Sequence, residues 1–136
     1  MSKMPAPKDA PPIVGVIDPD PVARSGLRTL LHGLGIDVST FDSAENFLLA
    51  ANGRAVACLI VDLLLPGMSG IELLRRLRSS GNDVPVILLA DESDVPTAVA
   101  AMREGATDFI EKPYVDVAVL KQVQKLLHTP PASAHA

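Results

Sequence analysis

The chain has 136 residues, of which 16 are acidic and 12 are basic, so its formal net charge at pH 7 is −4. This length suits one domain with a single core. The excess of acidic residues gives no indication of the basic surface that nucleic-acid binding requires. No apolar run approaches the roughly 20 residues needed to span a bilayer, so we expect a cytoplasmic protein that contacts neither a membrane nor nucleic acid.

Segments with the patterns of strands and helices alternate along the chain. Short aliphatic runs predict strands, and apolar residues three and four positions apart predict helices, most of which end at a glycine. The predicted elements are, in chain order, a strand at 13–17, a helix at 22–32, a strand at 36–41, a helix at 43–51, a strand at 55–61, a helix at 69–78, a strand at 84–89, a helix at 95–104, a strand at 107–110 and a helix at 115–128.

Cap residues mark where several of these helices begin and end. Gly33 and Gly35 are expected to stop the first helix. Ser69 and Glu72 have the spacing of a capping box and predict the start of the third helix, while Asp94 is expected to cap the fourth.

The regular alternation predicts an α/β fold. Parallel strands need crossover connections that cover both faces of their sheet, so we expect a single doubly wound, five-stranded parallel sheet of order 2-1-3-4-5 with five helices. This domain is expected to span residues 13–128. The segments 1–12 and 129–136 are rich in Pro, Ala and Ser, and we expect flexible tails there, or a linker stump at the second.

Polar residues follow three of the predicted strands. Asp18 and Asp20 come after the first strand, Asp62 after the third and Lys112 after the fifth. The third strand is the most apolar run of the chain, which is typical of the covered centre of a parallel sheet, and its lone Cys58 is expected to be a core filler. Ligands bind beyond the carboxyl ends of such strands, so these polar residues indicate a functional site at one edge of the sheet.

This combination resembles the receiver domain of response regulators, and within that family the FixJ-like subgroup. The likeness rests on two stretches of sequence, Asp62-Leu63-x-x-Pro66-Gly67-Met68-Ser69-Gly70-Ile71-Glu72-Leu73-Leu74 and Asp94-Val95-Pro96-x-Ala98-Val99-x-Ala101-Met102-x-x-Gly105-Ala106-x-Asp108-Phe109-Ile110-Glu111-Lys112-Pro113. Such domains are signalling switches of two-component systems, so the resemblance implies a signalling protein and not an enzyme.

The resemblance also implies roles for individual residues. Asp62 would accept a phosphoryl group from a histidine kinase or a phosphotransfer protein, and Lys112 would bind the phosphoryl oxygens. Mg²⁺ would be held by Asp18, Asp62 and the main-chain carbonyl of Leu64, and the Lys112-Pro113 peptide would be cis. Physical chemistry supports this set, because a carboxylate that attacks a phosphoryl group needs cations to neutralise the transferring oxygens, and oxygen ligands suit Mg²⁺.

Two positions depart from the family pattern. Pro19 stands where the family has a second metal-binding acid, and losing half of a roughly 4 kcal/mol charge interaction would weaken Mg²⁺ binding more than tenfold. Asp20 is a candidate substitute ligand, although adjacent side chains on an extended segment point to opposite faces. Ala90 replaces the family's switch Ser or Thr, so we expect weak coupling between phosphorylation and the aromatic switch residue, Phe109.

Two functions remain open from the sequence. The first is a phosphoacceptor receiver that signals to an output domain or effector outside this chain through a face formed by residues 95–104, 107–110 and 115–128. The first of these segments is apolar over more than one stripe, which favours a homodimer there. The second is a pseudo-receiver that works as a protein interaction module without phosphorylation, because Pro19 and Ala90 disable the switch. A flavin site is disfavoured, because the loop after the first strand presents acids and prolines.

Overall fold

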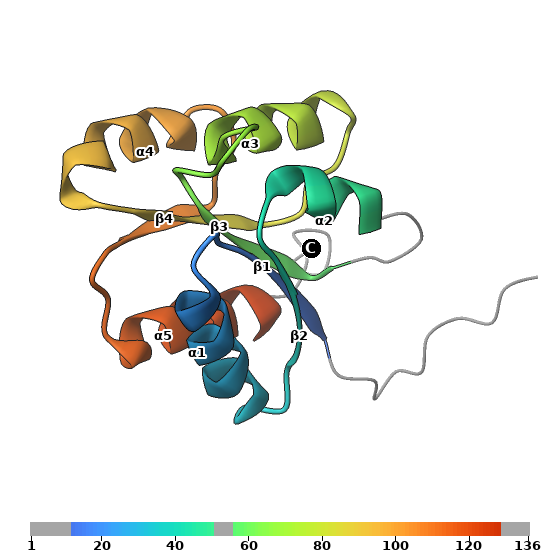
Figure 1. Ribbon diagram of the computed structural model, residues 1–136, viewed down its shortest axis with the longest axis vertical. Helices are drawn as coiled ribbons and strands as arrows, with labels where there is room; N and C mark the ends of the chain where they lie inside the picture. The colour runs from blue at the N-terminus through green and yellow to red at the C-terminus, as the bar shows by residue number, and fades with distance from the viewer. Residues whose placement is uncertain (1–11, 51–55, 129–136) are drawn as a thin grey trace, which may run out of the picture.

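The computed structural model describes residues 12–50 and 56–128, which form a five-stranded parallel sheet with helices on both faces (Figure 1). The strand order is β2-β1-β3-β4-β5, and every neighbouring pair is parallel. The predicted α/β class and strand order are therefore confirmed. The predicted tails lie outside the described residues except for Pro12, and so does the end of the second predicted helix, so the domain limits stay a prediction.

The strands lie where the apolar runs predicted them, with small shifts at their ends. They are β1 (Ile13–Ile17), β2 (Asp37–Phe41), β3 (Cys58–Asp62), β4 (Val86–Ala90) and β5 (Asp108–Glu111). The central strands β3 and β4 are buried along their whole length. β4 begins two residues later than predicted because Pro85 has no N–H to donate to the ladder.

The helices also follow the predicted order. They are α1 (Pro21–His32), α2 (Ala44–Ala50), α3 (Gly70–Ser79), α4 (Val95–Met102) and α5 (Asp116–His128), and a 3₁₀ turn that was not predicted, η1 (Glu92–Asp94), precedes α4. No helix in the described part of the chain has the length and apolar character that a membrane span requires.

The predicted helix caps have mixed outcomes. The capping box of α3 is confirmed, because Glu72 N donates to Ser69 Oγ (3.1 Å) and Ser69 N donates to Glu72 Oε1 (3.0 Å). The predicted cap by Asp94 is wrong. Asp94 occupies the N-cap position of α4, but its backbone (φ −102°, ψ 1°) belongs to the preceding turn, and its side chain makes no capping bond. Gly35 has a left-handed φ of +76° after α1, as a chain reversal requires.

Two hydrophobic layers sandwich the sheet. Helices α1 and α5 cover one face, and α2, α3 and α4 cover the other (Figure 1). Cys58 is a fully buried free cysteine of the first layer, and burial raises the pKa of its thiol to about 12, which suits the predicted core filler. The parallel register brings the carboxyl ends of β1, β3 and β5 to one edge of this sandwich, because Ile17 pairs with Val61 and Ala90 pairs with Glu111.

Candidate functional site

The carboxyl edge of the sheet brings together the two acids and the lysine that the sequence singled out. Lys112 Nζ lies 2.9 Å from Asp62 Oδ2 and 3.3 Å from Asp18 Oδ2. The lysine is 50 residues from Asp62 and 94 residues from Asp18 in the sequence, so only the sheet topology joins them. Asp18 is fully buried, Asp62 is 9% exposed, and the two are the buried charged residues of the described chain.

Backbone contacts hold each of these residues in place. Asp18 N donates to the Phe41 carbonyl of β2 (3.1 Å), and Asp18 Oδ1 accepts from Asp20 N (2.9 Å). Asp62 is the last residue of β3, and its Oδ1 accepts from Leu64 N (3.2 Å). Lys112 N donates to the Ala90 carbonyl (2.8 Å), and the Lys112-Pro113 peptide is cis, as the resemblance implied.

The charges of this cluster are strongly coupled. Burial raises the pKa of Asp18, against the hydrogen bond from Asp20 N and the positive charge of Lys112. Burial alone would lower the pKa of Lys112, but the hydrogen bond to Asp62 and the charges of both acids outweigh it and raise the pKa. Lys112 therefore carries a firmly held positive charge between the two acids, and because acids outnumber ammonium groups here the cluster is suited to attract a further cation.

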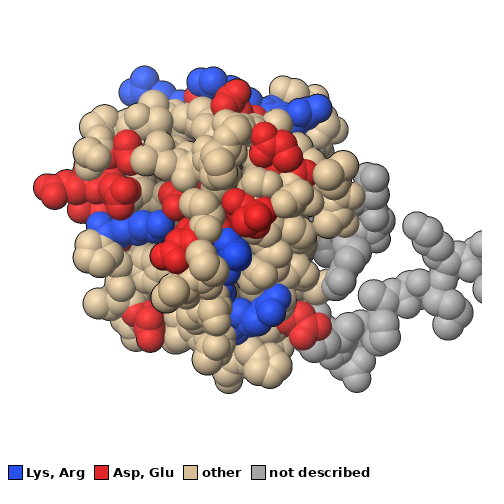
Figure 2. Space-filling view, viewed as in Figure 1, with Lys and Arg blue, Asp and Glu red and all other residues tan. Residues whose placement is uncertain are grey.

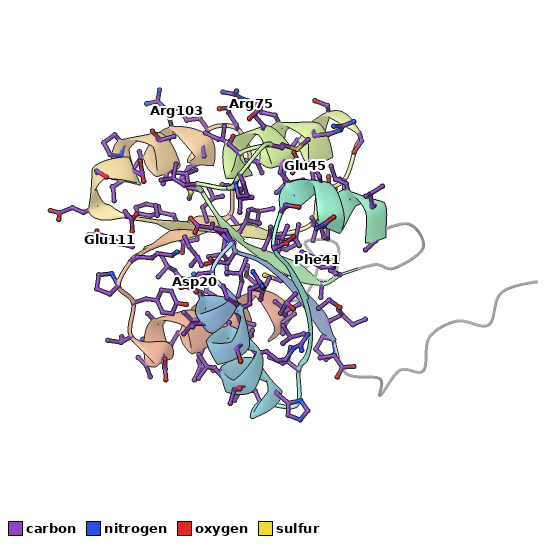
Figure 3. All side chains as sticks on the ribbon, viewed as in Figure 1. Asp20, Phe41, Glu45, Arg75, Arg103 and Glu111 are labelled. Atoms are coloured by element: carbon purple, nitrogen blue, oxygen red, sulfur yellow. The ribbon has the colours of Figure 1, made fainter. Side chains whose placement is uncertain are left out.

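Asp20 contacts this cluster through its backbone N–H, which donates to Asp18 Oδ1, while its carboxylate serves the helix that follows. It is exposed at the start of α1, and its Oδ1 accepts from Val22 N (2.9 Å), so its carboxylate caps the helix (Figure 3). This cap is the ordinary use of an Asp just before a helix with proline at its first position. Asp20 as a substitute metal ligand stays a prediction.

The two residues predicted as switch positions, Ala90 and Phe109, lie on the neighbouring strands β4 and β5. Ala90 is buried at the end of β4, where its methyl group offers no hydrogen-bond donor. Phe109 is partly buried on β5 beside Leu88 and packs against the core under α2, α3 and α4. Both residues lie on the strands predicted for them, their role as switch positions stays a prediction, and position 90 lacks the hydroxyl of the family pattern.

The donor atoms at this edge fit a hard cation. The Asp18 and Asp62 carboxylates and the Leu64 carbonyl are oxygen donors of the kind that Mg²⁺ prefers. Pro19 adds no donor from its side chain. Within residues 12–50 and 56–128, no group of three or more His, Cys, Asp and Glu side chains is arranged to hold a metal ion. The protein ligands therefore fit Mg²⁺ in kind and are few in number.

Two nearby residues were missed by sequence reasoning. Arg24 Nη1 donates to the Asp18 carbonyl (2.7 Å), a contact that depends on how α1 leaves β1 and that no sequence pattern signalled. Tyr114 lies close enough to the acids to be affected by their charge: burial and the charge of Asp18 raise the pKa of its hydroxyl. Its position two residues after Lys112 was the available signal.

A family model of the response regulator receiver domain matches residues 14–124. The chain belongs to this family. It is 43% identical over 101 residues to the transcriptional regulatory protein FixJ of Bradyrhizobium diazoefficiens, which covers 74% of this chain and 49% of that protein. It is 43% identical over 122 residues to the C4-dicarboxylate transport transcriptional regulatory protein DctD of Pseudomonas aeruginosa, which covers 90% of this chain and 26% of that protein. The predicted likeness to the FixJ-like subgroup is confirmed.

Solved structures of response regulators have the same fold as this receiver domain. Full-length FixJ from B. japonicum matches with a TM-score of 0.84 and 35% identity over 91% of this chain and 61% of that one. A putative response regulator from Chloroflexus aurantiacus matches with a TM-score of 0.81 and 27% identity over 88% of this chain and 99% of that one. The chain spans about half the length of FixJ and about a quarter of the length of DctD.

These likenesses establish a receiver domain of two-component signalling, a class of signalling regulators and not of classical enzymes. Receiver domains of this kind work with histidine kinases and output domains, and they generally use Mg²⁺ in phosphorylation. The comparisons give the phosphorylation-independent alternative no support over this function.

Proposed function

We propose that this receiver domain accepts a phosphoryl group on Asp62, from a histidine kinase or a phosphotransfer protein. The observation that supports this most is the contact of the Lys112 ammonium with Asp62 (2.9 Å) and Asp18 (3.3 Å) at an edge open enough to leave 25% of the lysine side chain exposed. An ammonium at this place can follow the charge as it moves from the carboxylate to the incoming phosphoryl oxygens.

The transfer exchanges one bond to phosphorus for another. A carboxylate oxygen of Asp62 forms a bond to phosphorus while the bond between phosphorus and the donor breaks, a P–N bond in a phosphohistidine or a P–O bond in acetyl phosphate. Lys112 leaves Asp62 Oδ2 and binds a phosphoryl oxygen. Asp18, Asp62 and the Leu64 carbonyl would hold Mg²⁺, which when bound supplies further positive charge to the phosphoryl group.

Phosphorylation by a small donor tests this function directly. The full chain with acetyl phosphate and millimolar Mg²⁺ should gain one phosphoryl group by intact mass, and Asp62→Asn should gain none. Labelled protein should show shifts of the Asp62 and Lys112 signals with beryllofluoride. If neither acetyl phosphate nor a kinase modifies the wild-type chain, Asp62 is not a phosphoacceptor and the domain acts as an interaction module.

We propose that the output is weakly coupled to this event, because position 90 carries a methyl group. No hydroxyl at position 90 can move toward the phosphoryl group and leave space for the Phe109 ring. The NMR signals of this ring should therefore change little with beryllofluoride. Ala90→Thr should enlarge that change, since the added hydroxyl can bind the phosphoryl group. An equally large response in the wild type would contradict this proposal.

We further propose that α4, β5 and α5 form the face that transmits the signal, including through a homodimer. Apolar side chains are exposed there, with Val99 at 50% and Met102 at 37% on α4 and Val117 at 62% on α5. Acidic side chains gather in the middle of the face shown in Figure 2 with basic ones between them, and further basic side chains lie along the edge formed by α3 and α4. We also propose that DNA contact belongs to an output domain outside this sequence, since this domain has a net negative charge, and that the domain works in the cytoplasm. Sedimentation with and without beryllofluoride tests the dimer.

A further inference from the structure

A loop of seven residues, 63–69, follows Asp62 and leads to α3. Its first part carries the Leu64 carbonyl, which the proposed function assigns to Mg²⁺, and Leu64 N donates to Asp62 Oδ1 (3.2 Å). Its last part is tied to α3 by the capping box. The carboxylate of Glu45 on α2 also contacts this loop. Its Oε2 accepts a hydrogen bond from Met68 N (2.8 Å), which is 23 positions later in the sequence. Figure 3 shows Glu45 on α2 beside the loop.

The loop is shaped to receive this carboxylate. Gly67 has a left-handed φ of +72°, and a Cβ placed on it would lie 2.5 Å from Glu45 Oε2 and 3.2 Å from Glu45 Cδ. A side chain at position 67 would therefore be strained by its backbone and would also displace the carboxylate. The space left by the missing side chain at position 67 and the N–H of Met68, which donates to Glu45, together form a close-fitting binding position for the Glu45 carboxylate.

The position of the 63–69 loop is important for metal binding because the site has few other ligands. Pro19 removes one carboxylate from the metal-binding set, so a larger share of metal binding rests on the Leu64 carbonyl. The bond between Leu64 N and Asp62 fixes the near end of the loop, and the bond between Met68 N and Glu45 fixes a point four residues further on. A loop held at two points presents its carbonyl in one place and loses less conformational entropy when an ion binds.

We propose that Glu45 is a positioning residue of the phosphorylation site, which acts by holding the 63–69 loop so that the Leu64 carbonyl is ready for Mg²⁺. This inference rests on the proposed function, because it assumes that this carbonyl serves the metal. The plainer alternative is an exposed hydrogen bond that only stabilises the fold. The two differ in one respect, since a purely structural bond would leave the Mg²⁺ affinity unchanged in the folded protein.

The test compares Glu45→Ala and Glu45→Gln with Asn46→Ala. Asn46 is the adjacent exposed residue of α2, and its Nδ2 donates to Asp42 Oδ1 (2.6 Å) without touching the loop, so it is a matched control. Exchange of the Met68 amide in metal-free protein and Mg²⁺ titration of the Leu64 amide signal are followed by NMR. Glu45→Ala should speed the exchange and raise the half-saturating Mg²⁺ concentration by about three- to tenfold, which is the size of the net contribution of one ordinary hydrogen bond.

The control variants separate the loss of the hydrogen bond to Met68 from a general effect of substitution on α2. Asn46→Ala should leave the Mg²⁺ half-saturation within about twofold of wild type, and Glu45→Gln should lie between wild type and Glu45→Ala, because its amide oxygen still accepts from Met68 N. Phosphorylation by acetyl phosphate should be slowed at limiting Mg²⁺ and should recover at saturating Mg²⁺. If Glu45→Ala is too unstable to study, Glu45→Gln alone must still weaken Mg²⁺ binding.

A double-mutant cycle that combines Glu45→Ala with Gly67→Ala tests the same contact from the loop. Gly67→Ala should also weaken Mg²⁺ binding because it expels the carboxylate, and adding Glu45→Ala to it should then cost little more. Unchanged Mg²⁺ affinity in Glu45→Ala, or full additivity in the cycle, would overturn the proposal. These titrations need no phosphodonor, so they decide the role of Glu45 even if Asp62 proves not to be phosphorylated.

Discussion

Two ion pairs in this receiver domain use the same chemistry in opposite surroundings. Lys112 contacts Asp18 and Asp62 at the carboxyl edge of the sheet, where one acid is fully buried and the other is 9% exposed. Arg75 of α3 contacts Glu104 beyond α4 through its Nε and Nη2, and these side chains are 57% and 33% exposed. The second pair is joined by two parallel hydrogen bonds, while the first is largely removed from solvent.

The difference shows what each pair is suited to do. An exposed pair exchanges its partners for water at little cost, so it adds little to stability and carries no reactivity. A buried cluster of two acids and one ammonium keeps an uncompensated charge in a region that screens it weakly, and this charge is available to a metal ion and a phosphoryl group. Substitutions in each pair, and at the position beside Asp18 where an acid is missing, test this difference.

The largest effect is expected for Lys112→Ala. Removing the ammonium leaves the transferring oxygens without their protein cation, so the rate of phosphorylation by acetyl phosphate at saturating Mg²⁺ should fall about a hundredfold, as when one stabilising donor is lost elsewhere. Time courses of intact mass give this rate directly.

Lys112→Arg is the control for this experiment. It keeps the charge but changes the geometry of the donors, so it should recover only part of the rate. A rate within twofold of wild type for Lys112→Ala would mean that Lys112 has a structural role, and the contrast between the two pairs would lose its functional meaning.

Pro19→Asp should sharpen the contrast by restoring the missing acid. A new carboxylate beside Asp18 should tighten Mg²⁺ binding about tenfold, because one decade corresponds to about 1.4 kcal/mol, which is well within the energy of one close charge pair. Mg²⁺ titration of the Leu64 amide signal measures the change. Pro19→Ala removes the ring without adding charge and should give no gain, and equal effects of the two variants would contradict the electrostatic explanation.

Asp18→Asn should raise the stability of the domain at neutral pH. Because burial raises the pKa of Asp18, its protonated form stabilises the fold below the ordinary carboxyl pKa, and that stabilisation is lost as the pH rises through the raised value. The amide resembles the protonated acid, so Tm should increase by a few degrees at pH 7, and the gain should shrink as the pH falls.

Calorimetry over a range of pH measures this effect, with Asp20→Asn as the matched control. Asp20 is exposed, and asparagine can also cap α1, so its Tm should hardly change. A lower Tm for Asp18→Asn would show that its 3.3 Å contact with Lys112 outweighs the penalty of burial.

The fold and the centre of the site followed from the sequence because both depend on strand order. Once the apolar runs were assigned to parallel strands, Asp62 and Lys112 had to lie at the same carboxyl edge, and the structure shows the lysine reaching across the end of β4 to the acid. The helix limits were less accurate where two turns compete, as at Asp94, whose backbone is taken by η1.

Contacts between side chains and loops were not predictable in the same way. Glu45 was read only as part of a helix, although Gly67 was visible in the sequence, because no pattern says which acid lies opposite a given loop. Arg24 was likewise missed, since its bond to the Asp18 carbonyl depends on the direction in which α1 leaves β1. Such pairs require the spatial arrangement of two elements.

The smallest effect is expected at the exposed pair. Arg75→Ala should lower Tm by no more than about one degree, and most of the loss should disappear in high salt. The hydrogen bond from Arg75 lowers the pKa of Glu104, so the stability from this pair is present above the ordinary carboxyl pKa and is lost as the pH falls through the lowered value. Calorimetry of Arg75→Ala, Glu104→Ala and the double variant measures the coupling. A coupling as large as the one that the same calorimetric cycle gives for Lys112→Ala and Asp62→Ala would mean that burial is not what separates the two pairs.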